Sequence, residues 1–123
     1  MQDAQDRAAE TVTIDVFDSL DIRAGRIISV DPFPEARKPS YKLRIDFGPL
    51  GSRQSSAQLT AHYTPEQLVG RMVVAVVNFP PRRIAGFASE VLVLGLPDRG
   101  IAREGGVVLI VPEQEVEPGA RVF

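Results

Sequence analysis

The chain has 123 residues, a formal net charge of −2 and no cysteine. This length fits one domain around a single modest core, and the lack of cysteine excludes disulfides and thiolate metal sites. The acidic N-terminal residues lack the basic start and apolar stretch of a signal peptide, and no apolar run is long enough to span a membrane. We therefore expect a cytoplasmic protein that does not insert into a membrane.

The N-terminal part of the chain contains a tail and a short helix. Residues 1–12 are mostly polar and show no periodic pattern, so we expect a disordered or flexible tail ahead of a single domain over 13–123. Residues 13–20 place apolar side chains on one helical face, and Thr13 or Asp15 is expected to cap this helix.

Three strands are expected in the next part of the chain. Residues 21–30 alternate as a strand, and Gly25 within this pattern indicates a bulge or bend that lets one strand serve two halves of a small barrel. After a proline-rich loop, residues 41–47 alternate most regularly between apolar and polar side chains. Residues 53–59 are weakly apolar and are expected to form a third strand with one exposed face.

A compact helix signal follows at 64–70. Thr64 and Gln67 have the spacing of a capping box, Pro65 stands at the first helical position, and Gly70 can end the helix in the left-handed conformation. We therefore expect a helix of one or two turns between the third and fourth strands.

Two apolar runs and a final short strand complete the expected fold. The runs at 72–79 and 90–96 are predicted to be strands four and five, separated by a loop rich in proline, arginine and phenylalanine. The run at 107–111 is predicted to be an additional strand, which we expect to pack with the apolar C-terminal end against a second copy of the chain. Five strands with a short helix between the third and fourth are the arrangement of the OB-fold. The predicted fold class is therefore mainly β, an OB-fold five-stranded barrel with terminal extensions.

No catalytic constellation is recognisable in the sequence. His62 is the only histidine and has no nucleophile motif nearby, and the serine pair at 55–56 lacks a nucleophile-elbow pattern. No glycine-rich phosphate loop occurs, and the alternating glutamates at 113–117 lie between prolines, which favours a solvated segment over a calcium site. We expect a binding protein that is not an enzyme and uses no cofactor or metal.

Basic residues concentrate in the middle of the chain. Residues 37–83 contain eight bases and two acids, which favours an anionic partner. OB-folds bind ligands along strands two and three and the adjacent loops, so phosphate contacts with a nucleic acid are one interpretation. The alternative is that these charges only keep an open sheet face soluble. The candidate nucleic-acid-binding residues from this pattern are Arg37, Lys38, Lys42, Arg44 and Arg53.

The aromatic residues indicate a second kind of ligand. Phe33, Phe79 and Phe87 lie among prolines, in stretches that are expected to be exposed. The default interpretation is that these rings pack into the core. Rings in such loops could instead stack on bases or line an apolar groove for an extended peptide.

Two segments carry specific motifs. Residues 21–27 read Asp-Ile-Arg-Ala-Gly-Arg-Ile, and residues 78–89 follow the pattern N-x-x-P-R-R-x-x-G-x-x-S. Both resemble motifs of the tRNA-binding OB-domain family, which also occurs appended to methionyl- and phenylalanyl-tRNA synthetases. Within this family, residues 32–43, 54–58 and 78–95 are most similar to a branch of bacterial chaperones.

The resemblance implies a homodimeric OB barrel, with the chain ends helping to form the interface, and two candidate activities. The first is chaperone-like binding of unfolded or export-bound polypeptides, in association with the Sec translocation machinery. The second is structure-specific binding of tRNA. The candidate peptide-binding residues are Phe33, Phe79, Pro80, Phe87, Arg82 and Arg83. For nucleic acid, the resemblance adds Asn78, Arg82, Arg83 and Ser89.

Two positions depart from the pattern of the tRNA-binding members. Leu92 stands where those members carry methionine, and Glu90 adds a negative charge where a phosphate backbone would approach. Both departures favour the peptide over tRNA.

Overall fold

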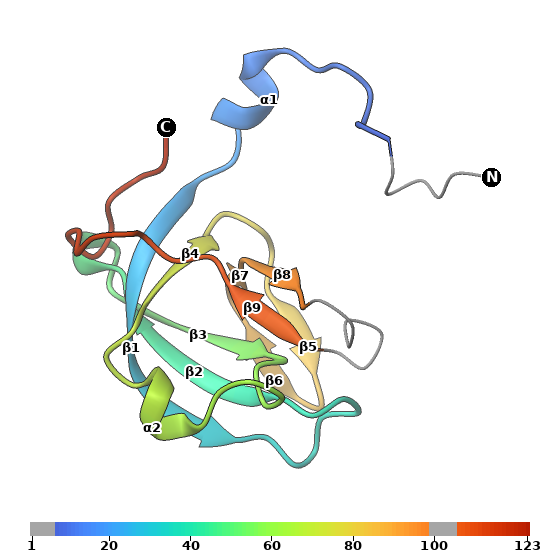
Figure 1. Ribbon diagram of the computed structural model, residues 1–123, viewed down its shortest axis with the longest axis vertical. Helices are drawn as coiled ribbons and strands as arrows, with labels where there is room; N and C mark the ends of the chain where they lie inside the picture. The colour runs from blue at the N-terminus through green and yellow to red at the C-terminus, as the bar shows by residue number, and fades with distance from the viewer. Residues whose placement is uncertain (1–6, 99–105) are drawn as a thin grey trace.

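Five antiparallel strands form one curved sheet in the order β3-β2-β1-β4-β7 (Figure 1). The computed structural model describes residues 7–98 and 106–123. The strands of this sheet are β1 (Ile22–Pro32), β2 (Tyr41–Asp46), β3 (Ser52–Ala57), β4 (Met72–Val76) and β7 (Leu92–Val93). The sheet curls into a nearly closed barrel, which confirms the predicted OB-fold.

The first strand serves both halves of the barrel, as its interrupted pattern predicted. Residues 22–26 of β1 pair with β4, and residues 26–32 pair with β2. The register shift in β1 lies between Ile27 and Ser29, whereas the sequence predicted an irregularity at Gly25. The predicted position of the bulge is therefore wrong, although the division of β1 between two neighbours is confirmed.

Gly25 is required by packing instead. A Cβ atom at this position would lie 2.6 Å from Cγ2 of Ile45 and 2.7 Å from Cε1 of Phe47. Both of these side chains are fully buried. The glycine therefore lets β1 approach the core more closely than any other residue could.

The core is built from alternate residues of the central strands. Leu43, Ile45 and Phe47 point inward along and just beyond β2, which confirms the alternation predicted over 41–47. The rest of the core cluster comprises Ile27, Leu59, Leu68, Val73, Ala75, Val77, Val91 and Leu109.

A short helix closes one end of the barrel between β3 and β4, as predicted. α2 (Pro65–Leu68) begins with a complete capping box, in which Thr64 N donates to Oε1 of Gln67 at 2.9 Å. Gly70 has a φ of +88°, and Leu68 is fully buried. A single turn of 3-10 helix, Gly48–Leu50, joins β2 to β3.

The apolar runs near the C-terminal end divide differently from the prediction. The expected fifth strand over 90–96 is split into β7 and β8 (Gly95–Pro97). β8 pairs with β9 (Val107–Leu109), which is the first part of the additional strand expected at 107–111. In the described part of the chain, no helix is long and apolar enough to cross a membrane.

The N-terminal helix stands apart from the barrel (Figure 1). α1 (Ile14–Asp18) has Thr13 at its N-cap position, without a side-chain capping bond. Its Ile14 side chain is 69% exposed. Asn78 holds the connection to β1, because its Oδ1 accepts from Asp21 N at 2.8 Å and its Nδ2 donates to Ser19 O at 2.9 Å.

The C-terminal segment returns to β1 and lies beside α1. Gly119 N donates to Ala24 O at 2.8 Å, and Val122 N donates to Ile22 O at 2.8 Å. Arg121 Nη2 donates to the backbone carbonyls of Asp18, the last residue of α1, and of Leu20 just after it. The end of α1 and the C-terminal segment therefore meet beside the start of β1.

Asp21 forms ion pairs with Arg23 on β1 and with Arg121 in the C-terminal segment. These pairs predict a pH dependence of stability. A hydrogen bond from Arg23 holds the pKa of Asp21 below its usual range, with a further contribution from Arg121. A carboxyl group with a lowered folded-state pKa stabilises the fold above its unfolded-state pKa of about 3.9 and loses this contribution as the pH falls through the folded-state value. We therefore expect Asp21→Asn to lose less stability than the wild type between pH 5 and pH 2.

Urea midpoints at the two pH values measure this difference, with Asp31→Asn, at an exposed position of β1, as the control. Equal losses in the wild type and Asp21→Asn would contradict the assignment.

Candidate binding groove

A β-hairpin occupies the segment that the sequence predicted to be an irregular loop. β5 (Arg82–Ile84) and β6 (Phe87–Ser89) are joined by a two-residue turn. The turn residues Ala85 and Gly86 have φ values of +48° and +81°, as a type I′ turn requires. The prediction of a loop is therefore wrong, and the two arginines lie on a strand.

An aromatic cluster fixes this hairpin against the barrel. The rings of Phe33 and Phe87 meet edge to face with centroids 5.4 Å apart, and Lys42 Nζ lies 4.8 Å and 5.3 Å from the two centroids. Phe33 is only 4% exposed, so its ring packs inward, as the default interpretation of the sequence predicted, although the stretch around it was expected to be exposed. Edge-to-face and cation–π contacts of this kind hold the hairpin, the loop before β2 and β2 together.

A polar seam joins the hairpin and its following residues to β3. Gln54 N donates to Oε1 of Glu90 at 2.8 Å, and Gln54 Nε2 donates to Ala88 O at 2.8 Å. Ser89 Oγ accepts from Ser56 N at 2.9 Å and is almost fully buried. Glu90 and Ser89 therefore close the barrel, and the Glu90 carboxylate caps a β3 amide.

These hydrogen bonds predict that Ser89 stabilises the fold. Ser89→Ala leaves Ser56 N–H without its acceptor in a partly buried place, so we expect a loss of about 1–3 kcal/mol in the free energy of unfolding. Urea denaturation measures the loss, and Ser29→Ala at an exposed position is the matched control. An unchanged unfolding free energy combined with weaker tRNA binding would instead make Ser89 a ligand contact.

The seam and the hairpin border a groove of about 930 Å³, which is within the usual size of ligand sites. It lies between the loop before β2, the end of β3, the hairpin, and strands β7 and β9. Its floor is mainly apolar, formed by Ala57, Leu59, Leu92, Val93, Leu94, Val107 and Leu109. Among residues 7–98 and 106–123, its charged lining residues are Arg37, Lys38, Arg82 and Arg83, with Glu35 as the single acid.

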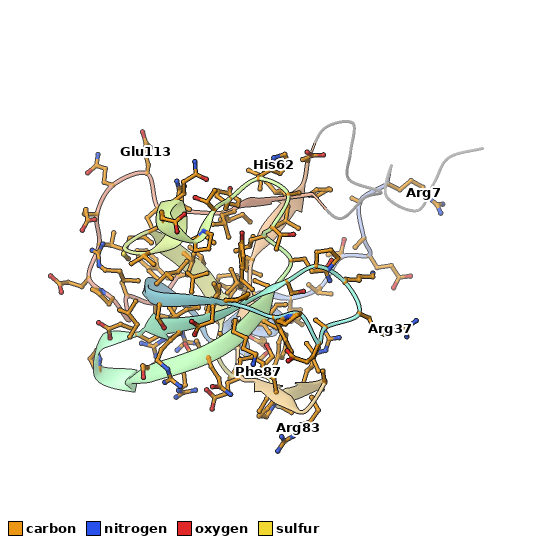
Figure 2. All side chains as sticks on the ribbon, turned by 90° about the horizontal axis from the view of Figure 1, so that it is seen from below. Arg7, Arg37, His62, Arg83, Phe87 and Glu113 are labelled. Carbon is orange, nitrogen blue, oxygen red and sulfur yellow. The ribbon has the colours of Figure 1, made fainter. Side chains whose placement is uncertain are left out.

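Figure 2 shows the side chains of Arg37 and Arg83 extending outward from the molecule, while Arg7 lies away from them on the N-terminal segment. The two labelled groove residues belong to the loop before β2 and to β5. Side chains far apart in the sequence therefore surround one groove with positive charge.

The groove brings together only part of each predicted residue set. From the nucleic-acid set it contains Arg37, Lys38, Arg82 and Arg83. Arg44 instead donates to Ser52 Oγ on the sheet face. The other members of this set also do not line the groove: Lys42, Arg53, Asn78 and Ser89. From the peptide set it contains the two arginines, whereas Phe33, Phe79, Pro80 and Phe87 do not line it.

The apolar floor was not predicted as part of a site. Leu92 is 45% exposed at the groove, although the sequence identifies it only as a departure from the family motif. Its neighbours in β7 and β9 read as ordinary core strands in the sequence. No local sequence signal distinguishes a strand that is buried on both faces from one with a face that stays exposed in the folded barrel.

The positions of the acidic and histidine side chains bear on whether a metal ion could bind. Over residues 7–98 and 106–123, no group of three or more His, Cys, Asp or Glu side chains could hold a metal ion. His62 Nε2 contacts the Asp98 carboxylate away from the groove. The arrangement at the groove itself suits the binding of an anionic or amphipathic chain.

Residues 22–121 match the family described as "Putative tRNA binding domain", and the chain belongs to this family. Among solved structures, it resembles the chaperone CsaA from Bacillus anthracis strain Ames, with 47% identity, a TM-score of 0.85, and coverage of 93% of this chain and 100% of that chain. The CsaA chaperone from Picrophilus torridus has 45% identity and a TM-score of 0.82, with coverage of 92% and 100%. These relatives confirm the resemblance to the chaperone branch.

A methionine–tRNA ligase from Porphyromonas gingivalis is 38% identical over 114 residues. The match covers 93% of this chain but only 16% of the ligase. The chain therefore corresponds to one small part of such ligases. The matched family is a tRNA-binding domain and the similar structures named above are chaperones, so neither comparison is with a catalytic domain.

Proposed function

We propose that this protein is a non-enzymatic chaperone of the CsaA type, which binds extended segments of unfolded or export-bound polypeptides in the groove. The observation that carries the proposal is the combination of an apolar floor with a cationic border. An unfolded chain exposes apolar side chains that the floor can bury. The border adds attraction for acidic segments and repels cationic ones.

The proposed site extends beyond the groove along the hairpin. Phe79 is 44% exposed, and Pro80 beside it is also exposed, so both add apolar surface next to β5. Phe87 and the buried Phe33 hold the hairpin in place, and Arg82 and Arg83 supply its charge. In the cell, this activity would hold clients in the cytoplasm before their transfer to the Sec machinery.

We further propose that residues 13–123 act as one domain in a homodimer whose interface includes α1 and the C-terminal segment. A cavity of about 370 Å³ lies between these ends, lined by Phe17, Leu20, Val122 and Phe123 among others. The Phe123 side chain is fully exposed and Ile14 is largely exposed, so both offer apolar surface to a second copy. Light scattering should give twice the chain mass of 13.4 kDa, and Ile14→Asp should lower it; a wild-type mass of one chain would refute the dimer.

Binding of tRNA is the second candidate function. It is supported by membership of the tRNA-binding domain family and by four cationic side chains, Arg37, Lys38, Arg82 and Arg83, around one groove. Phosphate contacts release counterions, so four contacts to single-stranded RNA would give a slope of about −3 for log affinity against log salt. A groove that uses its apolar floor depends less on salt.

One pair of titrations tests both candidates. A denatured client peptide and tRNA are titrated into the same sample at several salt concentrations, and suppression of client aggregation is measured in parallel. Leu92→Asn is expected to weaken client binding and leave tRNA binding unchanged, whereas Leu96→Asn, exposed on β8 outside the groove, is the matched control. Absence of peptide binding, together with a steep salt dependence for tRNA, would reject the chaperone and favour the alternative.

A further inference from the structure

The hairpin strand β5 has one open edge. β5 pairs with β6, and among residues 7–98 and 106–123 no other strand pairs with it. Beside a two-residue turn, the first pair of residues exchanges backbone hydrogen bonds, and here that pair is Ile84 and Phe87. The next pair, Arg83 and Ala88, therefore directs its backbone N–H and C=O groups away from the hairpin.

The two outer edges of the hairpin differ in what they bind. On β6, Ala88 O accepts a hydrogen bond from Gln54 Nε2 at 2.8 Å, which agrees with the outward direction of this pair. On β5, the backbone N–H and C=O of Arg83 have no protein partner among the described residues. The open edge therefore has one free donor and one free acceptor at the centre of the strand.

This edge faces the groove. Successive side chains of a strand point to opposite faces of its sheet, so a groove that meets only one face contacts every second residue. All three residues of β5, Arg82–Ile84, line the groove together with the turn residue Ala85, which is expected where a groove meets a strand along its edge.

We propose that the groove binds its client by strand addition, with an extended acidic segment pairing with β5 through the backbone of Arg83. This mode rests on the proposed chaperone function and specifies its ligand. Backbone pairing suits clients of many sequences, because every residue except proline offers the same N–H and C=O. Of the described residues, four basic side chains and one acidic one line the groove, which favours segments rich in glutamate or aspartate.

The open edge favours a polypeptide over RNA. A peptide strand presents donors and acceptors on alternate residues, at the spacing of a neighbouring strand. An RNA backbone carries phosphate acceptors and 2′-hydroxyls that can donate or accept, but it has no amide groups that repeat at the spacing of a neighbouring strand. The four cations alone would serve either ligand.

N-methylated peptides test the pairing directly. The probe is a blocked octapeptide of alternating glutamate and leucine, compared with two versions in which either all glutamate amides or all leucine amides are N-methylated. In a paired strand, alternate amides face β5, so one version should lose about tenfold or more in affinity while the other binds nearly as well as the parent. Sliding of the peptide by two residues leaves this contrast unchanged.

A matched pair of variants tests the protein side. Arg83→Ala removes the side-chain charge and keeps the outward N–H, whereas Arg83→Pro removes both. Because this N–H does not bond within the hairpin, Arg83→Pro should keep the fold, which circular dichroism and the urea midpoint check. We expect Arg83→Pro to bind the probe about three- to tenfold more weakly than Arg83→Ala.

The outcomes separate this inference from the function on which it rests. If the probe binds and both methylated versions bind equally well, strand addition is refuted and the chaperone function stands. If no peptide binds while tRNA does, both are refuted. Equal affinities for Arg83→Ala and Arg83→Pro, in variants that remain folded, would also overturn the pairing with β5.

Discussion

Replacing Arg82 and Arg83 together by glutamate is expected to lower affinity for acidic client segments by about 10- to 100-fold at low salt. Each change removes an attraction and adds a repulsion of about 0.2–1 kcal/mol at an exposed position. Both side chains line the groove and lie on a short strand held by the Phe33 and Phe87 rings. Fluorescence anisotropy with a labelled acidic peptide measures the loss, which should shrink as salt screens the charges.

The control for this prediction carries the same change in net charge outside the groove. Arg7 lies on the N-terminal segment, and Arg44 lies on the sheet face beside Ser52. Glutamate at both control positions should change the affinity by less than about threefold, because neither side chain lines the groove. An equal loss in the control would move the site to the open face of β2 and β3, where the charge pattern of the sequence also allowed it.

The second large effect is expected in the core, where Gly25 meets Phe47. Phe47→Ala removes a fully buried ring and should cost about 3–5 kcal/mol in the free energy of unfolding. Gly25→Ala forces a Cβ to within 2.7 Å of that ring and should cost about 1–3 kcal/mol.

The double variant tests whether these costs share one cause. Truncating Phe47 removes the close contacts of the new Cβ with the ring and leaves the one with Ile45, so the double variant should lose less stability than the sum of the single losses. Urea denaturation of the four proteins completes the cycle. Strict additivity would mean that the ring does not set the requirement for glycine.

The parts of the fold that the sequence predicted correctly depend on local signals. The alternation over 41–47 and the capping box of Thr64 and Gln67 are each complete within a few residues. The reason for Gly25 is not local, because its packing partners Ile45 and Phe47 lie in β2 and just beyond its end. The hairpin was missed because its strands are three residues long and Ala85-Gly86 is a weaker turn signal than Asn-Gly.

The candidate site shows the same division between local and long-range information. Charge clustering identified Arg37 and Lys38, and the family motif identified Arg82 and Arg83; these four line the groove. Lys42, Arg44 and Arg53, from the same charge pattern, do not line it. Two residues of the family motif make hydrogen bonds within the fold instead. Asn78 accepts from the backbone of Asp21 just before β1, and Ser89 accepts from the backbone of Ser56 on β3. The floor of the groove forms only when β7 and β9 meet the end of β3, which no short pattern records.

The pairing of the C-terminal segment with β1 has a consequence for the synthesis of the chain. β1 leaves the ribosome early, but the edge that bonds residues 119–122 stays without a partner until those residues emerge. Unpaired strand edges invite pairing with other chains, and contacts between distant parts of a sequence form slowly. The nascent protein therefore passes through a stage in which it is itself open to aggregation, the hazard from which it is proposed to protect its clients.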